Sequence, residues 1–577
     1  MSEISRYFSY QLDESGTGYI AVSLRGMAVL RLTATNKGTA FNHDERRALG
    51  LEGLLPPAVL TLDDHVNKLY EGFQRQVDDI EKYQFLRALQ DRNEVAFYAL
   101  LERHLEEMMP IVYTPTVGKA VQQFSSLYQA SRGLTISTQN IERVDECLDN
   151  YPWNDVRIIV ATDSSAILGI GDQGHGGMAI CVGKLALYTS GGGISPFHTM
   201  PVNLDVGTDS RKLLDDDKYL GVRHQRLSGK PYFEFMDQFV DHVERKWPKA
   251  VIQWEDFSRA VAYGVLERYQ DKIPCFNDDI QGTGSVVLSG LISACKIKGE
   301  AITDQCIIIV GAGAGGVGVA RAIKAGMMDA GLSDEQARRQ LFVVDITGLV
   351  VEGHLAEDGQ DDFMLPVSQF ESTYQDWDIE GQLPTLDEVV EHSGATALMG
   401  FTGCAGLFSE DMVKRLHENT DQPIVFPLSN PNSNCEATPQ DLADWTGGKA
   451  ILATGSPFPP VTYNGRDIRV GQGNNAFVFP GIGFASVLGK CRRISDAMVL
   501  ESAYALSDFT EEYYLAKGMI YPPVSALREV SVQVTARVLK VALEDGSSDR
   551  EELKNIDLED YVRSRSWEAK YLPFVAV

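Results

Sequence analysis

A short apolar run, followed at once by a glycine-rich loop and then a helix, constrains this chain most strongly. Residues 306–310 read Cys-Ile-Ile-Ile-Val, and residues 311–316 read Gly-Ala-Gly-Ala-Gly-Gly. A helical pattern covers residues 317–330, and the next apolar run ends in Asp345. This order of strand, loop, helix and strand is typical of a βαβ unit that binds a dinucleotide.

Each glycine of the loop meets a different requirement of that chemistry. Gly311 permits a tight turn, Gly313 lets the backbone approach a pyrophosphate, and Gly316 lets the helix pack closely on the strand. The pyrophosphate would then lie at the positive end of the helix. The alternative is a glycine-rich turn that binds no ligand.

Asp345 favours NAD over NADP, because a carboxylate accepts a hydrogen bond from the ribose 2′-hydroxyl and repels a 2′-phosphate. The surrounding sequence agrees with this reading. The stretch from Arg339 to Lys414 holds 15 acidic residues and no Lys or Arg between its ends. That stretch offers no cation to a 2′-phosphate, although another part of the chain could supply one.

Further apolar runs predict the remaining architecture. Residues 156–162, 341–345, 396–400 and 423–426 are each expected to form a buried strand, and helical patterns lie between the later ones. We therefore expect an α/β protein with a Rossmann-type, doubly wound parallel sheet, a second αβ domain and a helical N-terminal domain.

Composition excludes several classes of protein. The chain has 577 residues, enough for several domains, and 44% are apolar, so wholesale disorder is excluded. The net charge of −28 argues against nucleic acid or an anionic membrane as partner. We find no run of about 18 uncharged apolar residues and therefore expect no membrane span. The N-terminus has no targeting pattern and the eight cysteines form no C-x-x-C pair, so we expect a cytoplasmic protein.

The N-terminal part reads as helical. Residues 64–109 show apolar positions three and four apart, and Pro110 is expected to end that helical stretch. Residues 1–30 are expected to form a small arm, and the sequence assigns it no role.

Two acidic pairs lie among apolar and aromatic residues. Glu255 and Asp256 stand between Trp254 and Phe257, and the pair 278–279 follows Phe276-Asn277. Acids in such surroundings are costly unless they are paired or bind a metal. Carboxylate oxygens suit Mg²⁺ or Mn²⁺. The pattern alone fits a metal site and a network of ion pairs equally well. In an extended segment, the two acids of 278–279 would point to opposite sides.

Taken together, these stretches resemble the malic enzyme family from about residue 36 to residue 571. The motifs that carry the resemblance are Asn-Lys-Gly-Thr-Ala-Phe (36–41), Leu-Glu-Gly-Leu-Leu-Pro-Pro (51–57), Val-Tyr-Thr-Pro-Thr-Val-Gly (112–118), Ile-Leu-Gly-Ile-Gly-Asp-Gln-Gly (167–174), the acidic segments at 255 and 278, Pro-Leu-Ser-Asn-Pro (427–431), Gly-Asn-Asn-Ala-Phe (473–477) and Tyr-Pro-Pro (521–523).

The resemblance implies oxidative decarboxylation of L-malate to pyruvate and CO₂, with reduction of NAD and with Mg²⁺ or Mn²⁺. By the same carry-over, Glu255, Asp256 and Asp279 would bind the metal. Lys184 would be the general base, and Asp278 would pair with it and tune it. The base is needed because hydride transfer from C2 requires loss of the hydroxyl proton.

Three more roles follow from the resemblance. Tyr113 would be the general acid that protonates the enolate left by CO₂ loss. Asn430 and Asn475 would contact malate, and Asn430 would also lie near the nicotinamide. Without the family motifs, a single tyrosine or asparagine in such a place would be read as a packing or turn residue.

The resemblance also implies a domain order and an assembly. We expect a helical N-terminal domain over 1–130 and a catalytic αβ domain over 131–277, to which residues 476–545 return. A Rossmann-type NAD-binding domain is expected over 278–475 and a helical tail over 546–577. The family is typically dimeric or tetrameric, so a homodimer or homotetramer is expected.

The chain departs from the family pattern at two positions. Many members have an arginine that binds a malate carboxylate where this chain has Ala166, and an asparagine where it has Val261. The dianionic substrate would have to meet its cation elsewhere, and Arg157 is too early in its strand to be proposed. Because valine has no polar side chain, the hydrogen bond that the asparagine would make to support the metal ligands is missing or replaced at Val261.

Two other functions compete with the leading one. Malolactic enzymes, which turn malate into lactate while NAD stays bound, also lack the arginine. The sequence at 516–518 and 521–523 looks more like the malic enzymes. A non-catalytic sensor of malate or NAD is a third hypothesis, motivated by Ala166 and Val261. Against it, every expected proton-transfer and metal residue is present.

Overall fold

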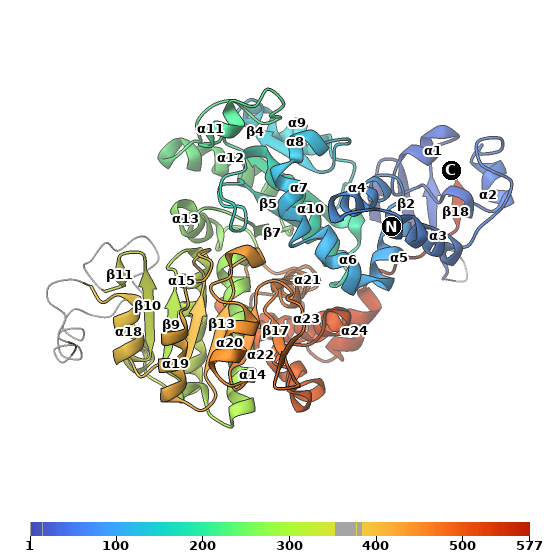
Figure 1. Cartoon of the computed structure of the whole chain (residues 1–577). Coiled ribbons are helices and arrows are strands. Elements are labelled where there is room, and N and C mark those ends of the chain that lie inside the picture. The colour runs from blue at the N-terminus through green and yellow to red at the C-terminus, as the bar shows by residue number, and fades with distance from the viewer. Residues whose placement is uncertain (1, 14–15, 352–376, 378–382) are drawn as a thin grey trace. The chain divides into compact units, whose positions relative to one another are not determined.

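The computed structural model describes residues 2–13, 16–351, 377 and 383–577 (Figure 1). Its contacts divide the chain into two compact units. The first unit comprises Met1–Asp256 with Asp560–Val577, and the second comprises Phe257–Glu559. Most of the acidic stretch that lacks cations, residues 352–376 and 378–382, lies outside the described residues.

The N-terminal arm is part of a four-stranded sheet. The strands lie in the order β1 (Ser2–Ser5), β2 (Phe8–Leu12), β3 (Gly18–Val22) and β18 (Phe574–Ala576). β18 runs parallel to β3 and comes from the other end of the chain. The strands of the arm and β18 were not predicted. β18 pairs with β3 across more than 500 residues, and a local pattern does not report such pairing.

A helical layer follows the arm, as expected for residues 64–109. It consists of α3 (Leu62–Gln74), α4 (Asp79–Gln90), α5 (Glu94–Arg103) and α6 (Leu105–Val112). Side chains cap α3, α4 and α5 at their N-termini, which satisfies amide groups that a helix leaves unpaired.

The expectation that Pro110 ends the helix is wrong. Pro110 lies inside α6, which continues to Val112. The proline removes one intrahelical hydrogen bond. The helix continues because Ile111 and Val112 are buried and the amide of Tyr113 still donates to the carbonyl of Met109 at 2.9 Å.

The first unit is built on parallel strands in the order β4 (Leu134–Ser137), β6 (Thr199–Asp205), β5 (Ile158–Thr162) and β7 (Val251–Trp254). All residues of β5, β6 and β7 are buried, which explains the apolar sequence of β5. Helix α10 (Met178–Ser190) packs on β5 and β6, and every one of its residues is buried.

The second unit contains a seven-stranded sheet, seen in Figure 1 as neighbouring arrows. The order is β11 (Gly348–Leu349), β10 (Leu341–Asp345), β9 (Ile307–Val310), β12 (Ala397–Gly400), β13 (Ile424–Pro427), β14 (Ile451–Thr454) and β17 (Val470–Gln472). Only β11 is antiparallel to its neighbour among these strands. The predicted α/β fold with a parallel sheet is confirmed, and each expected run in this part forms a strand.

Helices cover this sheet and extend beyond it. α15 (Ala314–Asp329) follows β9, and α14 (Thr283–Lys298) packs against α15 and α22 (Asp496–Tyr513). α21 (Phe479–Gly489) and α23 (Leu527–Glu544) pack together. The helical segment Asp278–Lys298 is, within the described chain, the one long and apolar enough to cross a membrane. It is 72% buried inside the fold, as the core helix of a soluble protein is.

Candidate functional site

Lys184 and Tyr113 lie close together inside the first unit. Lys184 is on α10 and is 1% exposed, and Tyr113 is the residue that ends α6. The Lys184 ammonium lies 5.3 Å from the centre of the Tyr113 ring. Gly183 permits this approach, because a Cβ at that position would lie 2.7 Å from the carbonyl oxygen of Val112. The structure therefore brings the expected base and the expected acid together.

Glu255 is a charged partner of Lys184 within this unit. The ammonium lies 2.9 Å from Oε1 of Glu255, and both side chains are almost fully buried. Oε2 of Glu255 accepts a hydrogen bond from the side-chain amide of Gln253 at 2.8 Å, and Oε1 of Gln253 accepts one from the Tyr188 hydroxyl at 2.5 Å. Both carboxylate oxygens are thus engaged, which makes burial of the charge tolerable.

Asp256 is held by a loop that contains position 166. Its Oδ1 accepts a hydrogen bond from the amide of Leu168 at 3.0 Å, and its carbonyl accepts one from the amide of Ala166 at 3.1 Å. Asp256 and Leu168 both have positive φ, 57° and 43°, which costs non-glycine residues energy. The structure fixes the direction of the Asp256 carboxylate at the cost of this backbone strain.

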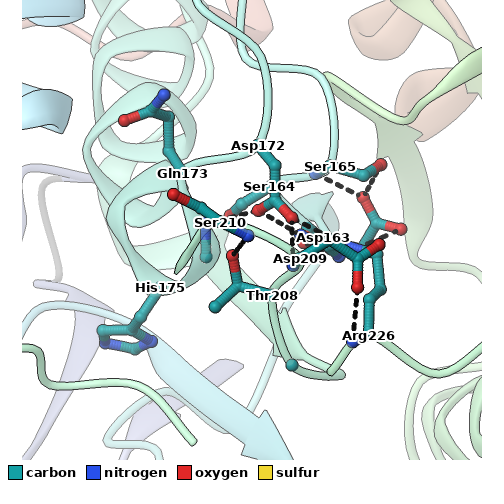
Figure 2. A network of polar contacts seen from close by, with 12 residues as sticks. Asp163, Ser164, Ser165, Asp172, Gln173, His175, Thr208, Asp209, Ser210 and Arg226 are labelled. Atoms are coloured by element: carbon teal, nitrogen blue, oxygen red, sulfur yellow. Dashed lines mark hydrogen bonds and ion pairs between the residues drawn. The ribbon is translucent and has the colours of Figure 1, made fainter. Parts of the chain in front are cut away.

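Arg226 holds the same loop through Asp163 and Asp172 (Figure 2). Its guanidinium donates to both carboxylate oxygens of Asp172, at 2.6 and 3.3 Å, and to the carbonyl of Asp163 at 2.8 Å. Its positive charge and hydrogen bond outweigh the effect of burial and hold the pKa of Asp172 below its ordinary value. The Asp163 carboxylate in turn accepts from Ser165 and from the hydroxyl of Tyr232.

The arginine that many family members carry at position 166 has no replacement at that position. Ala166 contributes its amide to Asp256, and Arg226 points at Asp172 and Asp163. Sequence reasoning did not find Arg226, because it lies 54 residues from Asp172 in the chain and no local motif marks it.

Cys181 is a buried neighbour of these acids whose thiol is poorly suited to act as a nucleophile. Burial raises the pKa of its thiol well above the ordinary value, and the charges of Glu255 and Asp256 raise it further. A thiol with a raised pKa is a poor nucleophile. All eight cysteines are free in the structure.

Asp278 belongs to the second unit and is fully buried there. The side-chain amide of Asn475 donates to its Oδ2 at 3.0 Å and to its carbonyl at 3.3 Å. The same amide lies 3.0 Å from the hydroxyl of Thr283. Gly282 leaves room for the carboxylate, since a Cβ there would lie 2.0 Å from Oδ1. Two of the expected site residues, Asp278 and Asn475, are therefore brought together.

The premise that Asp278 and Asp279 lie in an extended segment is wrong. They open a helical turn, Asp278–Gly282, that leads into α14, and Asn277 caps the turn by accepting from the amide of Ile280. The two acids still differ in exposure, because Asp278 is buried and Asp279 is only partly so.

Asn430 lies at the C-terminal edge of the seven-stranded sheet. It precedes Pro431 through a cis peptide bond, and its side-chain carbonyl accepts a hydrogen bond from Ser456. A neighbouring acid, Glu436, was missed by the sequence analysis. It is fully buried and accepts hydrogen bonds from the amide and hydroxyl of Thr402, each at 2.8 Å, and from the hydroxyl of Ser429 at 2.5 Å. Glu436 thereby hydrogen-bonds both the loop after β12, at Thr402, and the loop after β13, at Ser429.

The glycine loop has the geometry that a dinucleotide requires. Gly311 has a φ of +99°, and a Cβ there would lie 2.6 Å from the carbonyl oxygen of Phe401. A Cβ on Gly316 would lie 1.8 Å from the carbonyl oxygen of Gly311. Gly313 precedes α15, and a Cβ there would meet no atom within 4 Å. The backbone at Gly313 is therefore open to a ligand at the positive end of a 16-residue helix.

Asp345 ends β10, beside the start of the glycine loop. β10 and β9 are parallel, with Val344 opposite Val310. Oδ1 of Asp345 accepts the amide of Ile346 at 2.9 Å, and Oδ2 lies 3.2 Å from the guanidinium of Arg259. Both side chains are partly exposed. The acid expected for the ribose is thus placed where a nucleotide on the loop would reach it.

The donor chemistry fits the expected groups. Glu255 and Asp256 are consecutive, buried carboxylates at the end of β7, and hard oxygen donors of this kind suit a divalent cation. The open backbone at Gly313 fits the pyrophosphate of a dinucleotide, and the carboxylate of Asp345 fits its ribose. Asp279, the third expected metal ligand, belongs to the second unit.

Comparison with known proteins covers most of the chain. Residues 90–270 match a family described as "Malic enzyme, N-terminal domain", and residues 280–543 match "Malic enzyme, NAD binding domain". A protein of Aliivibrio fischeri named NAD-dependent malic enzyme is 43% identical over 548 residues, which are 95% of this chain and 96% of that protein. A protein of Pseudomonas syringae pv. tomato with the same name is 44% identical over 91% of this chain and 93% of that protein.

Solved structures show the same fold. The crystal structure of Entamoeba histolytica malic enzyme matches with a TM-score of 0.56 and 20% identity, over 89% of this chain and 90% of that one. The malic enzyme from Pyrococcus horikoshii matches with a TM-score of 0.52 and 22% identity, over 80% and 88%.

Proposed function

The chain belongs to the malic enzyme family, and we propose that it oxidises L-malate with NAD and decarboxylates the product to pyruvate and CO₂, with Lys184 and Tyr113 moving the protons. The family resemblance expected from the motifs is thereby confirmed. The observation that carries the proposed mechanism is the position of the buried Lys184 ammonium, 5.3 Å from the Tyr113 ring.

Proton balance explains why these two residues are needed together. Malate dianion and NAD⁺ become pyruvate anion, CO₂ and NADH with no net gain or loss of protons. One proton leaves the C2 hydroxyl before hydride transfer, and one proton is added to C3 after CO₂ has left. A base and an acid that lie close together can pass that proton between them. Lys184, in its neutral amine form, takes the hydroxyl proton, Tyr113 protonates C3, and the Lys184 ammonium so formed then returns the proton to Tyr113.

The remaining residues bind and orient. When bound, NAD accepts the hydride and a divalent cation acts as a Lewis acid toward substrate oxygen. Glu255 and Asp256 would supply carboxylates to that cation, and Asp279 is the third ligand that the family resemblance implies. The amide of Leu168 keeps the Asp256 carboxylate in one direction. Asn475 holds Asp278, and Asn430 and Asn475 offer amide groups to malate.

The second candidate is the malolactic reaction, because malolactic enzymes also lack the arginine that Ala166 replaces. The product distinguishes the two functions. Purified protein is mixed with L-malate, NAD⁺ and Mn²⁺, and NADH, pyruvate and lactate are followed together. We expect NADH and pyruvate to rise in a one-to-one ratio. Lactate without NADH would replace the proposal with the malolactic reaction. Neither product, with NAD still bound, would favour the sensor.

A variant pair tests the role of Lys184. Lys184→Ala removes the base, and removal of a general base typically lowers turnover by about 10²- to 10⁴-fold. Lys230→Ala is the matched control, because Lys230 is a solvated lysine of the same unit with 86% of its side chain exposed. Unchanged turnover in the Lys184→Ala variant would refute the assignment.

We further propose a cytoplasmic homodimer or homotetramer. The free cysteines, five of them buried, suit a reducing compartment. Light scattering on a sizing column would measure the mass of the particle, for which two or four chains of 63.6 kDa are expected. A particle of one chain would refute the assembly.

A further inference from the structure

Arg259, which lies outside the acidic stretch in the sequence, places a cation beside Asp345. Arg259 begins helix α13 (Arg259–Tyr269), 86 residues before Asp345, and its Nη1 lies 3.2 Å from Oδ2 of Asp345. The side chains of Arg259 and Asp345 are 22% and 29% exposed. Both are therefore fixed by contact with each other and still within reach of a ligand.

Helix α13 is attached to the glycine loop itself. Tyr263 lies one turn after Arg259, and its hydroxyl donates to the carbonyl of Ala314, the first residue of α15, at 3.1 Å. The guanidinium of Arg321, on α15, lies 4.9 Å from the centre of the Tyr263 ring. Because residues four apart share one face of a helix, Arg259 is held over the same loop that Tyr263 contacts.

We propose that Arg259 is a specificity-determining residue of the nucleotide site: Asp345 holds its guanidinium in the native protein, and loss of the Asp345 carboxylate releases it to bind a 2′-phosphate. The proposal rests on the proposed NAD-dependent function of this unit. A guanidinium presents paired donors that match a phosphate, and an arginine near the end of the second strand is the group that accommodates NADP in Rossmann folds.

The native pair explains the expected preference for NAD. The charges of Asp345 and Arg259 cancel, and the remaining lone pairs of the carboxylate are available to a ribose hydroxyl. A 2′-phosphate would meet the carboxylate first and would have to take Arg259 away from it. Without the Asp345 carboxylate, the guanidinium of Arg259 leaves a positive charge at this position. Arg259 could then supply the cation for NADP that the acidic stretch lacks.

Binding of two adenosine ligands tests the proposal without turnover. ADP-ribose represents the adenosine half of NAD, and adenosine 2′,5′-bisphosphate represents that of NADP. Calorimetry measures both with the wild type, Asp345→Ala and Asp345→Ala/Arg259→Gln. We expect Asp345→Ala to bind the bisphosphate at least about tenfold more tightly than the wild type, because a charge-assisted hydrogen bond to phosphate is gained. The double variant should lose that gain.

The ratio of the two affinities is taken within each variant, so that a general loss of nucleotide binding cancels. Asp345→Ala/Arg321→Gln is the matched control: it removes the guanidinium that lies over the Tyr263 ring, leaves Arg259 in place and should keep the gain. If the Arg259 double variant binds too weakly to measure, the single variant Arg259→Gln should fail to gain bisphosphate binding relative to ADP-ribose.

The outcomes separate this proposal from the proposed function. A wild type that does not bind ADP-ribose would refute the NAD-dependent function. A wild type that binds ADP-ribose, together with an Asp345→Ala/Arg259→Gln variant that binds the bisphosphate as tightly as Asp345→Ala, would refute the role of Arg259 alone. Asp345→Ala that gains nothing would refute it as well.

Discussion

Replacing Arg226 by glutamine should destabilise the first unit and loosen the loop that holds Asp256. The variant loses a two-point contact with Asp172 and a hydrogen bond to the carbonyl of Asp163. The Arg226 and Asp172 side chains are 11% and 18% exposed, so Asp172 would keep a largely buried charge without its cation. Removing one partner of a buried pair typically costs 3–5 kcal/mol, and the residual exposure places this case at about 3 kcal/mol.

Chemical denaturation measures that cost, with the fluorescence of the tryptophans as the signal. Arg245→Gln is the matched control, because Arg245 lies 3.5 Å from Asp145 with more than 60% of both side chains exposed, and such surface pairs contribute little. Arg226→Lys keeps the charge without the planar fork and should fall between the two.

A second readout links the network to the metal site. Arg226 fixes the loop whose amides at Ala166 and Leu168 hold Asp256, so Arg226→Gln should also weaken Mn²⁺ binding measured by calorimetry in the absence of malate and NAD. An Arg226→Gln variant that unfolds at the same denaturant concentration as Arg245→Gln would refute the reasoning.

Further predictions concern the nucleotide loop, the buried histidine and the N-terminal pair. Gly316→Ala should abolish ADP-ribose binding, since its Cβ would lie 1.8 Å from the Gly311 carbonyl oxygen, and normal binding would contradict the loop geometry. His175 is buried, which lowers its pKa below 6.5 although Asp205 and Asn203 act in the opposite direction. The unfolded chain therefore takes up the proton first as the pH falls, so the stability advantage of wild type over His175→Gln should shrink below about pH 6.5; denaturation at pH 8 and 5.5 measures it, and a constant difference would contradict it. Lys37→Met should leave Glu45 buried without its cation and lower the denaturation midpoint, whereas an unchanged midpoint would show that the amide of Phe574 suffices for Glu45.

Local sequence predicted the second unit's sheet well for a physical reason. Strands buried on both faces are continuous apolar runs, and Ile307–Val310 and Ile424–Pro427 are of this kind. The glycine loop was predictable because each glycine answers a steric demand that the structure shows at Gly311 and Gly316. The helical turn at Asp278 was not, because the cap that starts it depends on the side chain of Asn277 rather than on any periodicity.

The site was predictable only where a motif carried it. Lys184 and Tyr113 came from the family resemblance, and Glu255 was marked first as part of an acidic pair among apolar residues. The ion pair between Lys184 and Glu255 came from the structure. Arg226 and Arg259 lie 54 and 86 residues from Asp172 and Asp345, and no local pattern predicted which acid either arginine would contact. Contacts of this kind depend on the tertiary fold and leave no local signal.

Two half-reactions test the division of labour between Lys184 and Tyr113 most directly. The first half-reaction is exchange of the pyruvate C3 hydrogens with D₂O in the presence of Mn²⁺, which NMR measures. This exchange requires the group that moves the proton at C3, Tyr113. Reduction of oxaloacetate by NADH requires a proton on the C2 oxygen and none on C3. The account predicts that Tyr113→Phe loses the exchange and keeps the reduction, while Lys184→Ala loses both. A Tyr113→Phe variant that exchanges C3 hydrogens at the wild-type rate would contradict it.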